Sequence, residues 1–108
     1  MRRGDLVTIS LQGDYGKPRP ALVIQSDMFS EARSKTVLPL TSTLIDAPLI
    51  RVQIEPTPQN RLRAASHVMI DKVATLPVDK LGPSFGTVDD ATMVTVNRAL
   101  ALFLGLAG

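Results

Sequence analysis

The first two-thirds of the chain consist of short apolar runs, rich in β-branched residues, that are separated by glycine, proline and asparagine. Such runs are typical of β-strands joined by tight turns, and they leave little room for helices. With 108 residues, the chain can build one domain around one modest core. We expect five strands, at residues 5–11, 21–25, 36–43, 49–55 and 66–74, the last bending near Lys72.

Three of these runs carry further information. The run at 21–25 is apolar until Gln25, so we expect a strand that is buried on both faces. Pro39 lies inside the run at 36–43 and predicts an edge strand or a bulge there. The run at 49–55 alternates, which places Ile50, Val52 and Ile54 on one face and the polar residues on the other.

The last third of the chain changes to a helical period. Residues 77–81 predict one helical turn that ends before Gly82 and Pro83. Residues 87–90 resemble a capping box, with Thr87 as the cap and an aspartate in place of the usual glutamate. An amphipathic helix of about four turns should follow. Its apolar positions are Met93, Val96, Leu100, Phe103 and Leu104.

Five short strands followed by a helix predict a mainly β (α+β) fold in a single domain over residues 1–108. The strands should form a small, curved antiparallel sheet or half-open barrel, and the C-terminal helix should close one end or pack on a face. A sheet of this size leaves apolar surface uncovered, so we expect a homodimer.

The chain contains no cysteine, which excludes disulfides and thiolate metal sites. The start of the chain lacks an apolar signal segment, and residues 99–106 are too few to span a bilayer, so we expect a cytoplasmic protein. The net charge is only +2. A basic loop face would suit a polyanion, although an ordinary solvated surface explains the same charges. The basic residues concerned are Arg2, Arg3, Lys17, Arg19, Arg33, Lys35, Arg61 and Arg63.

The sequence contains no phosphate-binding loop, no nucleophile elbow and no dinucleotide fingerprint. Ser66 and His67 are adjacent on a predicted strand, so their side chains should point to opposite faces. We therefore expect His67 to be a surface or packed imidazole. We expect neither a metal site nor a cofactor.

Arg19 is the first candidate for chemistry. Pro18 and Pro20 flank it and stiffen its backbone in an extended conformation at the mouth of an apolar strand. A stiffened arginine is suited to hold a phosphate with two parallel hydrogen bonds. The alternative is that the prolines protect a strand edge and that Arg19 is merely solvated.

Two other polar features lie within predicted strands, one at the end of the run at 36–43 and one inside the run at 66–74. The hydroxyl groups of Thr41, Ser42 and Thr43 are suited either to phosphate or ribose oxygens, or to local bonds with the backbone of a turn. Asp71 lies inside the last predicted strand, where a charged residue usually occupies the exposed face.

Taken together, these segments resemble the MazF/PemK family of toxin ribonucleases. The similarity rests on four stretches in the same order: RRGDLVTI at 2–9, KPRPALVIQSD at 17–27, VLPLTST at 37–43 and HVMIDKVATLP at 67–77. The resemblance implies a curved barrel of the CcdB/MazF type that works as a homodimer. It also implies metal-independent cleavage of single-stranded RNA by the ribose 2′-hydroxyl, growth inhibition, and neutralisation by a cognate antitoxin.

The resemblance also implies roles for individual residues. Arg19 and Thr41 match the catalytic arginine and hydroxyl, and Asp71 matches an acid that assists in some members. Lys17, Ser42 and Lys72 would bind RNA. The loop from Asp14 to Lys17 would cover the RNA channel and meet the antitoxin.

The chain departs from the family pattern after Asp71. Lys72 and Ala74 occupy positions where many members have glutamine and arginine, so a contact to RNA is expected to be lost or moved. The second half also resembles CcdB, a gyrase-poisoning relative. That similarity implies, as an alternative, a gyrase inhibitor that acts through its C-terminal helix. However, the chain lacks the C-terminal tryptophan on which that activity depends. A decayed toxin that only binds its antitoxin is a third alternative.

Overall fold

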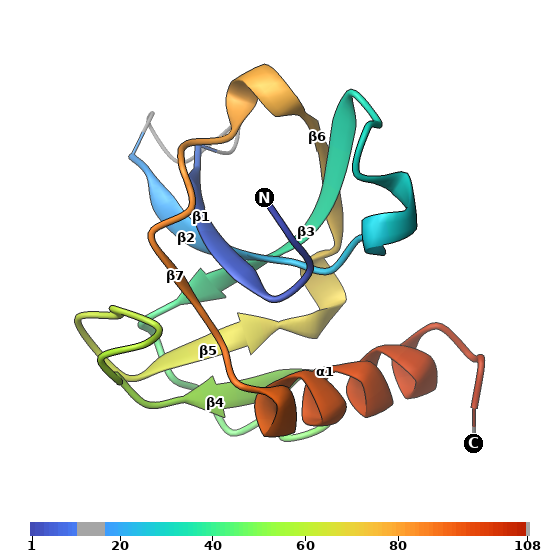
Figure 1. The fold of residues 1–108 in the computed structure, drawn as a ribbon. Coiled ribbons are helices and arrows are strands. Elements are labelled where there is room, and N and C mark those ends of the chain that lie inside the picture. Colours follow the sequence, from blue (N-terminus) through green and yellow to red (C-terminus); the bar gives the residue numbers. More distant parts are fainter. Residues whose placement is uncertain (11–16, 108) are drawn as a thin grey trace.

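Seven short strands and one C-terminal helix make up the part of the chain that the computed structural model describes, residues 1–10 and 17–107 (Figure 1). The expected antiparallel sheet with a terminal helix is confirmed. Single 3₁₀ turns occur at η1 (Asp27–Phe29), η2 (Ile70–Lys72) and η3 (Val78–Lys80). The main elements are β1 (Asp5–Ile9), β2 (Arg19–Val23), β3 (Ser34–Thr41), β4 (Arg51–Ile54), β5 (Ser66–Met69), β6 (Ala74–Pro77), β7 (Gly86–Thr87) and α1 (Asp90–Phe103).

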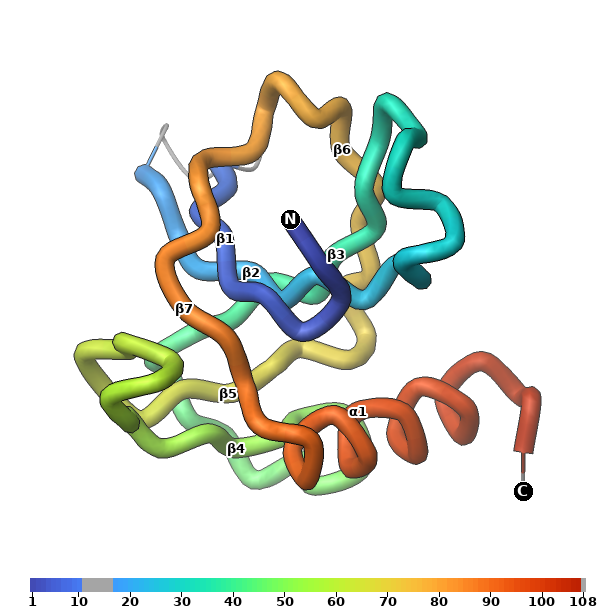
Figure 2. Tube along the Cα trace, in the orientation of Figure 1, coloured from blue at the N-terminus to red at the C-terminus, as the bar shows by residue number. Residues whose placement is uncertain are grey.

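The sheet curls into a half-open barrel. Its strand order is β4-β5-β3-β2-β1-β7, and β6 pairs with the first half of β3. A bridge between Ile9 and Leu81 then joins β1 to the segment that follows β6. Strands β1, β2, β3 and β6 therefore form a small ring, while β4 and β5 extend from it toward the helix (Figures 1 and 2).

Strand β2 is buried on both faces, as the apolar run at 21–25 predicts. Leu22 packs into a larger core that includes Leu6, Leu38 and Val96 of the helix. Ala21 and Val23 face a second core inside the ring. The central strands thus need apolar residues at consecutive positions, because each strand separates two cores.

Strand β3 is the central strand, so the prediction that Pro39 marks an edge strand is wrong, and Pro39 lies instead where the ladder on one side of β3 is interrupted. On one side β3 pairs with β2. On the other side it pairs first with β6, up to Val37, and then with β5, from Leu40. Ile24 donates its N–H to the carbonyl of Thr36, so even-numbered residues of β3 direct their backbone groups toward β2. Pro39 therefore faces the break between β6 and β5, where no ladder donor is needed.

The run at 66–74 forms two strands rather than one bent strand. The turn η2 separates β5 from β6 at the expected bend near Lys72, and each strand then pairs with a different half of β3. The short strand β7 was not predicted, because Gly86 and Thr87 carry no apolar alternation. The turn predicted at 77–81 is present as η3.

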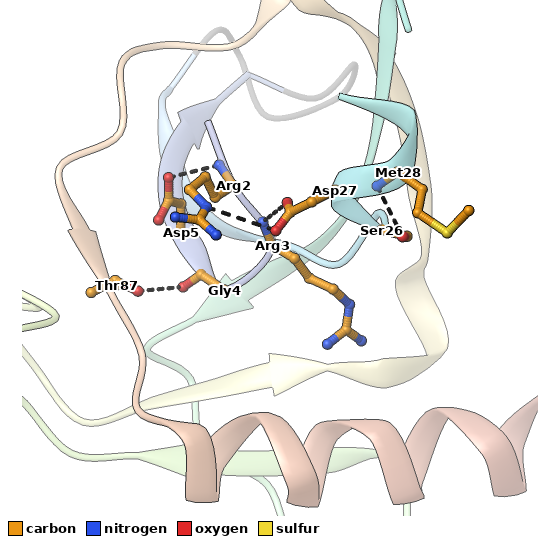
Figure 3. Close-up of polar contacts among 8 residues, drawn as sticks. All are labelled: Arg2, Arg3, Gly4, Asp5, Ser26, Asp27, Met28 and Thr87. Carbon is orange, nitrogen blue, oxygen red and sulfur yellow. Dashed lines mark hydrogen bonds and ion pairs between the residues drawn. The ribbon is translucent and has the colours of Figure 1, made fainter. Parts of the chain in front are cut away.

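The C-terminal helix α1 spans 14 residues and buries Val96 against the sheet. Its cap is Asp89, whose side chain accepts a hydrogen bond from the N–H of Thr92 at 2.7 Å. The capping box on Thr87 is thus wrong by two residues. The Thr87 hydroxyl instead donates to the carbonyl of Gly4 (Figure 3).

The Arg3-Gly4-Asp5 segment ties the N-terminus to distant parts of the chain, and Figure 3 shows its contacts with Asp27 and Thr87. The N–H of Arg3 donates to Asp27 at 2.8 Å, and its guanidinium reaches the carbonyl of Ile24 and the side chain of Asn97 on α1. Gly4 has a φ of +95°, a conformation that glycine adopts without strain. These residues therefore stabilise the fold.

Candidate active site

A cavity of about 840 Å³ opens where the start of β2, the end of β3 and the loop at 55–65 come together. These three segments lie on the same side of the molecule, at the left of Figures 1 and 2. Four of the six predicted site residues line it. The described lining residues are Thr8, Lys17, Pro18, Arg19, Pro20, Leu40, Thr41, Ser42, Thr43, Arg61, Leu62, Arg63, Ala64, Ser66 and Phe85.

The register of the sheet brings Arg19 and Thr41 together. The β2–β3 ladder ends at the pair Ala21 and Pro39. Arg19 precedes Ala21 by two residues and pairs with Ile9 of β1, while Thr41 follows Pro39 by two residues and pairs with His67 of β5. Both residues line the cavity that opens where the ladder ends. A guanidinium and a hydroxyl are thus presented to the same cavity.

The Thr41 hydroxyl is held by its own turn. The backbone N–H of Thr43 donates to Thr41 Oγ1 at 3.1 Å. This is the local bond that a turn of hydroxyl residues commonly makes. It orients Oγ1 as an acceptor toward the backbone and leaves the hydroxyl proton to donate elsewhere. The local bond and a catalytic role are therefore compatible.

The cavity is strongly basic. Lys17, Arg19, Arg61 and Arg63 line it, and no carboxylate does so among the described residues. The predicted basic loop face is only partly present, because Lys35 is a buried strand residue that donates to the carbonyl of Ser30 at 2.9 Å. The sequence motifs predict no role in the site for Arg61 and Arg63, beyond their place in the basic loop face. Their signal is two arginines flanking one leucine directly after a proline-rich turn.

Asp71 and Lys72 do not line the cavity. Asp71 lies in η2 and forms an ion pair with Arg51 of β4, and Lys72 lies 3.4 Å from the same carboxylate. Partial burial acts to raise the pKa of Asp71, but the hydrogen bond and charge of Arg51 outweigh it and hold that pKa below its ordinary value of 3.8. The geometry thus gives Asp71 a structural partner that the sequence did not reveal.

Asp71→Asn is expected to destabilise the protein by about 1–2 kcal/mol at pH 7, because it leaves the mostly buried Arg51 guanidinium without its counter-charge. Since the folded pKa is lowered, the contribution of the carboxylate is present above pH 3.8 and is lost as the pH falls through the folded value. Urea unfolding should therefore show a gap between wild type and variant that narrows below pH 3.8. A gap that widens in acid would contradict this.

His67 is a packed imidazole, one of the two environments expected for it. It is 6% exposed, its Nδ1 lies 3.5 Å from the N–H of Ile45, and its Nε2 lies 3.4 Å from Gln53 Oε1. Ser66 bonds to the carbonyl of Ala64 instead. Within residues 1–10 and 17–107, no three histidine or acidic side chains lie close enough to hold a metal ion. No helix there is long and apolar enough to cross a membrane.

Comparisons with known proteins agree with this fold. Residues 2–104 match the family described as PemK-like, MazF-like toxin of type II toxin–antitoxin systems. A probable endoribonuclease MazF from Mycolicibacterium smegmatis is 50% identical over 109 aligned residues, which cover all of both chains. The solved structure of an endoribonuclease in complex with its cognate antitoxin, from a mycobacterial species, superimposes with a TM-score of 0.82 at 28% identity, over 100% of this chain and 98% of that one.

The toxin MazF-mt6 of Mycobacterium tuberculosis has the same fold, with a TM-score of 0.82 at 23% identity over 96% of this chain and 99% of that one. The family match spans β1 to α1, including every described element that forms the cavity. The chain therefore belongs to the family of PemK-like, MazF-like toxins of type II toxin–antitoxin systems.

Proposed function

We propose that this protein is the toxin of a toxin–antitoxin pair and cleaves single-stranded RNA without a metal ion. One observation carries the proposal: Arg19 and Thr41 line the same basic cavity in a chain that belongs to the MazF-like toxins. The 50% identical relative bears the name of an endoribonuclease, which supports the same activity here. RNA binds as single strands to basic grooves of this kind.

The proposed reaction is attack of a ribose 2′-hydroxyl on the neighbouring phosphorus. The 2′-oxygen loses its proton, the bond to the 5′-oxygen of the next nucleotide breaks, and that oxygen takes up a proton. The products are a 2′,3′-cyclic phosphate and a 5′-hydroxyl. The transition state concentrates negative charge on the phosphoryl oxygens, so prearranged donors give the largest benefit. Arg19 would donate two hydrogen bonds to these oxygens, and Thr41 would donate one.

The remaining predicted site residues differ in whether they line the cavity. Lys17 and Ser42 line the cavity beside Arg19 and Thr41, in positions suited to neighbouring phosphates. The roles of Asp71 in catalysis and of Lys72 in RNA binding rest on the family resemblance alone. Both residues lie in η2, outside the cavity. Of the predicted covering loop, Asp14, Tyr15 and Gly16 lie outside the described residues.

The alternative of a gyrase inhibitor is not favoured. The family match covers residues 2–104 with MazF-like toxins, and the relative that matches over its whole length bears an endoribonuclease name. The chain contains no tryptophan to serve as the anchor that CcdB uses.

The partners follow from the same proposal. A mycobacterial endoribonuclease of this fold is solved in complex with its cognate antitoxin, so we propose a cognate antitoxin for this chain. We also propose a cytoplasmic location, because the proposed substrate is cellular single-stranded RNA. Apolar side chains remain open at Met28, Phe29, Leu49 and Leu106, which are 87%, 59%, 68% and 78% exposed. Burial of such surface favours a homodimer.

The proposal is tested by incubating the purified protein with single-stranded RNA in excess EDTA. We expect cleavage at defined short sequences, and we expect it to persist in EDTA because the proposed reaction needs no metal. DNA of the same sequence should remain intact, since it lacks the attacking hydroxyl. Complete inhibition by EDTA, or intact RNA under all conditions, would contradict the proposal.

A further inference from the structure

The loop at residues 55–65, between β4 and β5, is organised around the side chain of Asn60, which is 3% exposed. Its Oδ1 accepts the N–H groups of Thr57 and Leu62, each at 2.9 Å, and its Nδ2 donates to the carbonyl of Glu55 at 2.9 Å. The hydroxyl of Thr57 accepts the N–H of Asn60 in return. One buried amide thus satisfies backbone groups on both sides of the turn and makes the loop rigid.

The loop is also fixed to the rest of the fold. The N–H of Thr87 in β7 donates to the carbonyl of Gln59 at 3.1 Å. Gly86 packs so closely that a Cβ there would lie 2.4 Å from the carbonyl oxygen of Asn60. Leu62 is 8% exposed and joins the larger core. The loop is therefore anchored by hydrogen bonds, by a glycine contact and by an apolar side chain.

This rigid loop presents two arginines to the cavity, one on each side of the buried Leu62. Arg61 and Arg63 are exposed and both line the cavity. Neither guanidinium makes a hydrogen bond or ion pair with another described residue. Arg61 has a φ of +55°, the left-handed conformation that arginine rarely adopts. An unusual backbone conformation and two unpartnered cations at one cavity are consistent with a binding function.

We propose that residues 55–65 form a phosphate-binding arm, in which Arg61 and Arg63 hold backbone phosphates of the RNA strand beside the phosphate that Arg19 and Thr41 contact. This inference rests on the proposed function and adds a second anion site to it. The cavity is continuous from Lys17 and Arg19 to Arg61 and Arg63, with no carboxylate among the described lining residues. Contacts to phosphates fix the register of a strand without reading its sequence.

The test is a binding measurement with fluorescein-labelled single-stranded RNA of random sequence, in an Arg19→Ala background that keeps the RNA intact. For single strands, each phosphate contact contributes about 0.7 to the slope of log K against log salt concentration. The pair Arg61→Asn and Arg63→Ala should therefore weaken binding and lower the slope by about 1.4. Asparagine tolerates the left-handed conformation, so the loop should keep its backbone.

Two controls separate charge from structure. The pair Arg33→Ala and Arg98→Ala removes two exposed arginines that do not line the cavity, and it should leave affinity and slope unchanged. The double variant Arg61→Lys and Arg63→Lys should restore most of the slope, because lysine also binds phosphate. In the enzyme that retains Arg19, the double variant Arg61→Asn and Arg63→Ala should raise KM by a larger factor than it lowers kcat.

If the double variant Arg61→Asn and Arg63→Ala showed an unchanged salt slope, the proposal would be overturned. The two arginines would then be assigned to binding an acidic polypeptide partner instead of RNA. The proposal would also be overturned if the lysine double variant lost as much of the salt slope as the Asn/Ala double variant. Such a result would show that the loss does not depend on the charge at positions 61 and 63. Failure of the proposed function looks different. In that case the enzyme with Arg19 would leave RNA uncleaved, whatever the arm variants do to binding.

Discussion

Arg19→Ala is expected to lower the rate of RNA cleavage by at least about a hundredfold, while the fold stays intact. The guanidinium would contact the phosphoryl oxygens where charge develops, and removing one such prearranged donor costs about 10²–10³ in rate. Arg19 is only partly buried, so its truncation leaves no large cavity in the core. Single-turnover cleavage of an RNA with one cleavage site measures the effect directly.

Two matched variants show which property of the Arg19 side chain the cleavage rate depends on. Arg19→Lys keeps the charge but lacks the planar pair of donors, and it should recover only part of the rate. Arg33→Ala removes an arginine that does not line the cavity and should cleave like the wild type. If Arg19→Ala cleaved within about threefold of the wild type, the assignment of Arg19 to catalysis would be wrong.

The second large effect concerns stability, not rate. Asn60→Ala is expected to lower the free energy of unfolding by about 3 kcal/mol. The substitution leaves the N–H groups of Thr57 and Leu62 and the carbonyl of Glu55 without the side chain that satisfies them. Each unsatisfied buried group costs about 1–3 kcal/mol, and water admitted to the opened turn recovers part of this. Urea unfolding followed by circular dichroism measures the change.

Gln59→Ala provides the control for the same turn. Gln59 is exposed, and its role in the fold is the backbone carbonyl that accepts from Thr87, which alanine keeps. Its substitution should change stability by less than about 0.5 kcal/mol. An Asn60→Ala variant as stable as Gln59→Ala would show that the side chain does not organise the loop.

Much of the fold follows from local patterns. The apolar run at 21–25 predicts a strand buried on both faces, and the two cores that pack against β2 explain why it must be apolar. The alternation at 49–55 places Val52 and Ile54 inward, as found. The terminal helix is set by the spacing of Met93, Val96 and Leu100. These features depend on residues close in sequence, which is why the sequence reveals them.

The errors arise where distant segments meet. Pro39 predicts an edge strand, but its missing N–H faces the break between two partner strands. Asp71 looks like an exposed strand residue, but Arg51 of β4 pairs with it. Thr87 looks like a helix cap, but it bonds to Gly4 at the other end of the chain. Local patterns carry no information on such partners.

The candidate site shows the same division. The two prolines around Arg19 indicate a stiffened arginine, and the hydroxyl run indicates Thr41, but only the pairing of β2 with β3 brings both to one cavity. The positions of Arg61 and Arg63 depend on a turn around Asn60, and the burial of Asn60 cannot be predicted from the sequence. The residue types were thus predictable, while their convergence was not.

The central claim is that the protein cleaves RNA by attack of a ribose 2′-hydroxyl. The most direct measurement compares two RNAs that differ by one oxygen, at the nucleotide whose 2′-hydroxyl would attack at a mapped cleavage site. We predict that the all-ribose RNA is cut to a 2′,3′-cyclic phosphate and a 5′-hydroxyl, and that the RNA with one 2′-deoxynucleotide stays intact there. Cleavage of both RNAs at equal rates, with 5′-phosphate ends, would contradict the account.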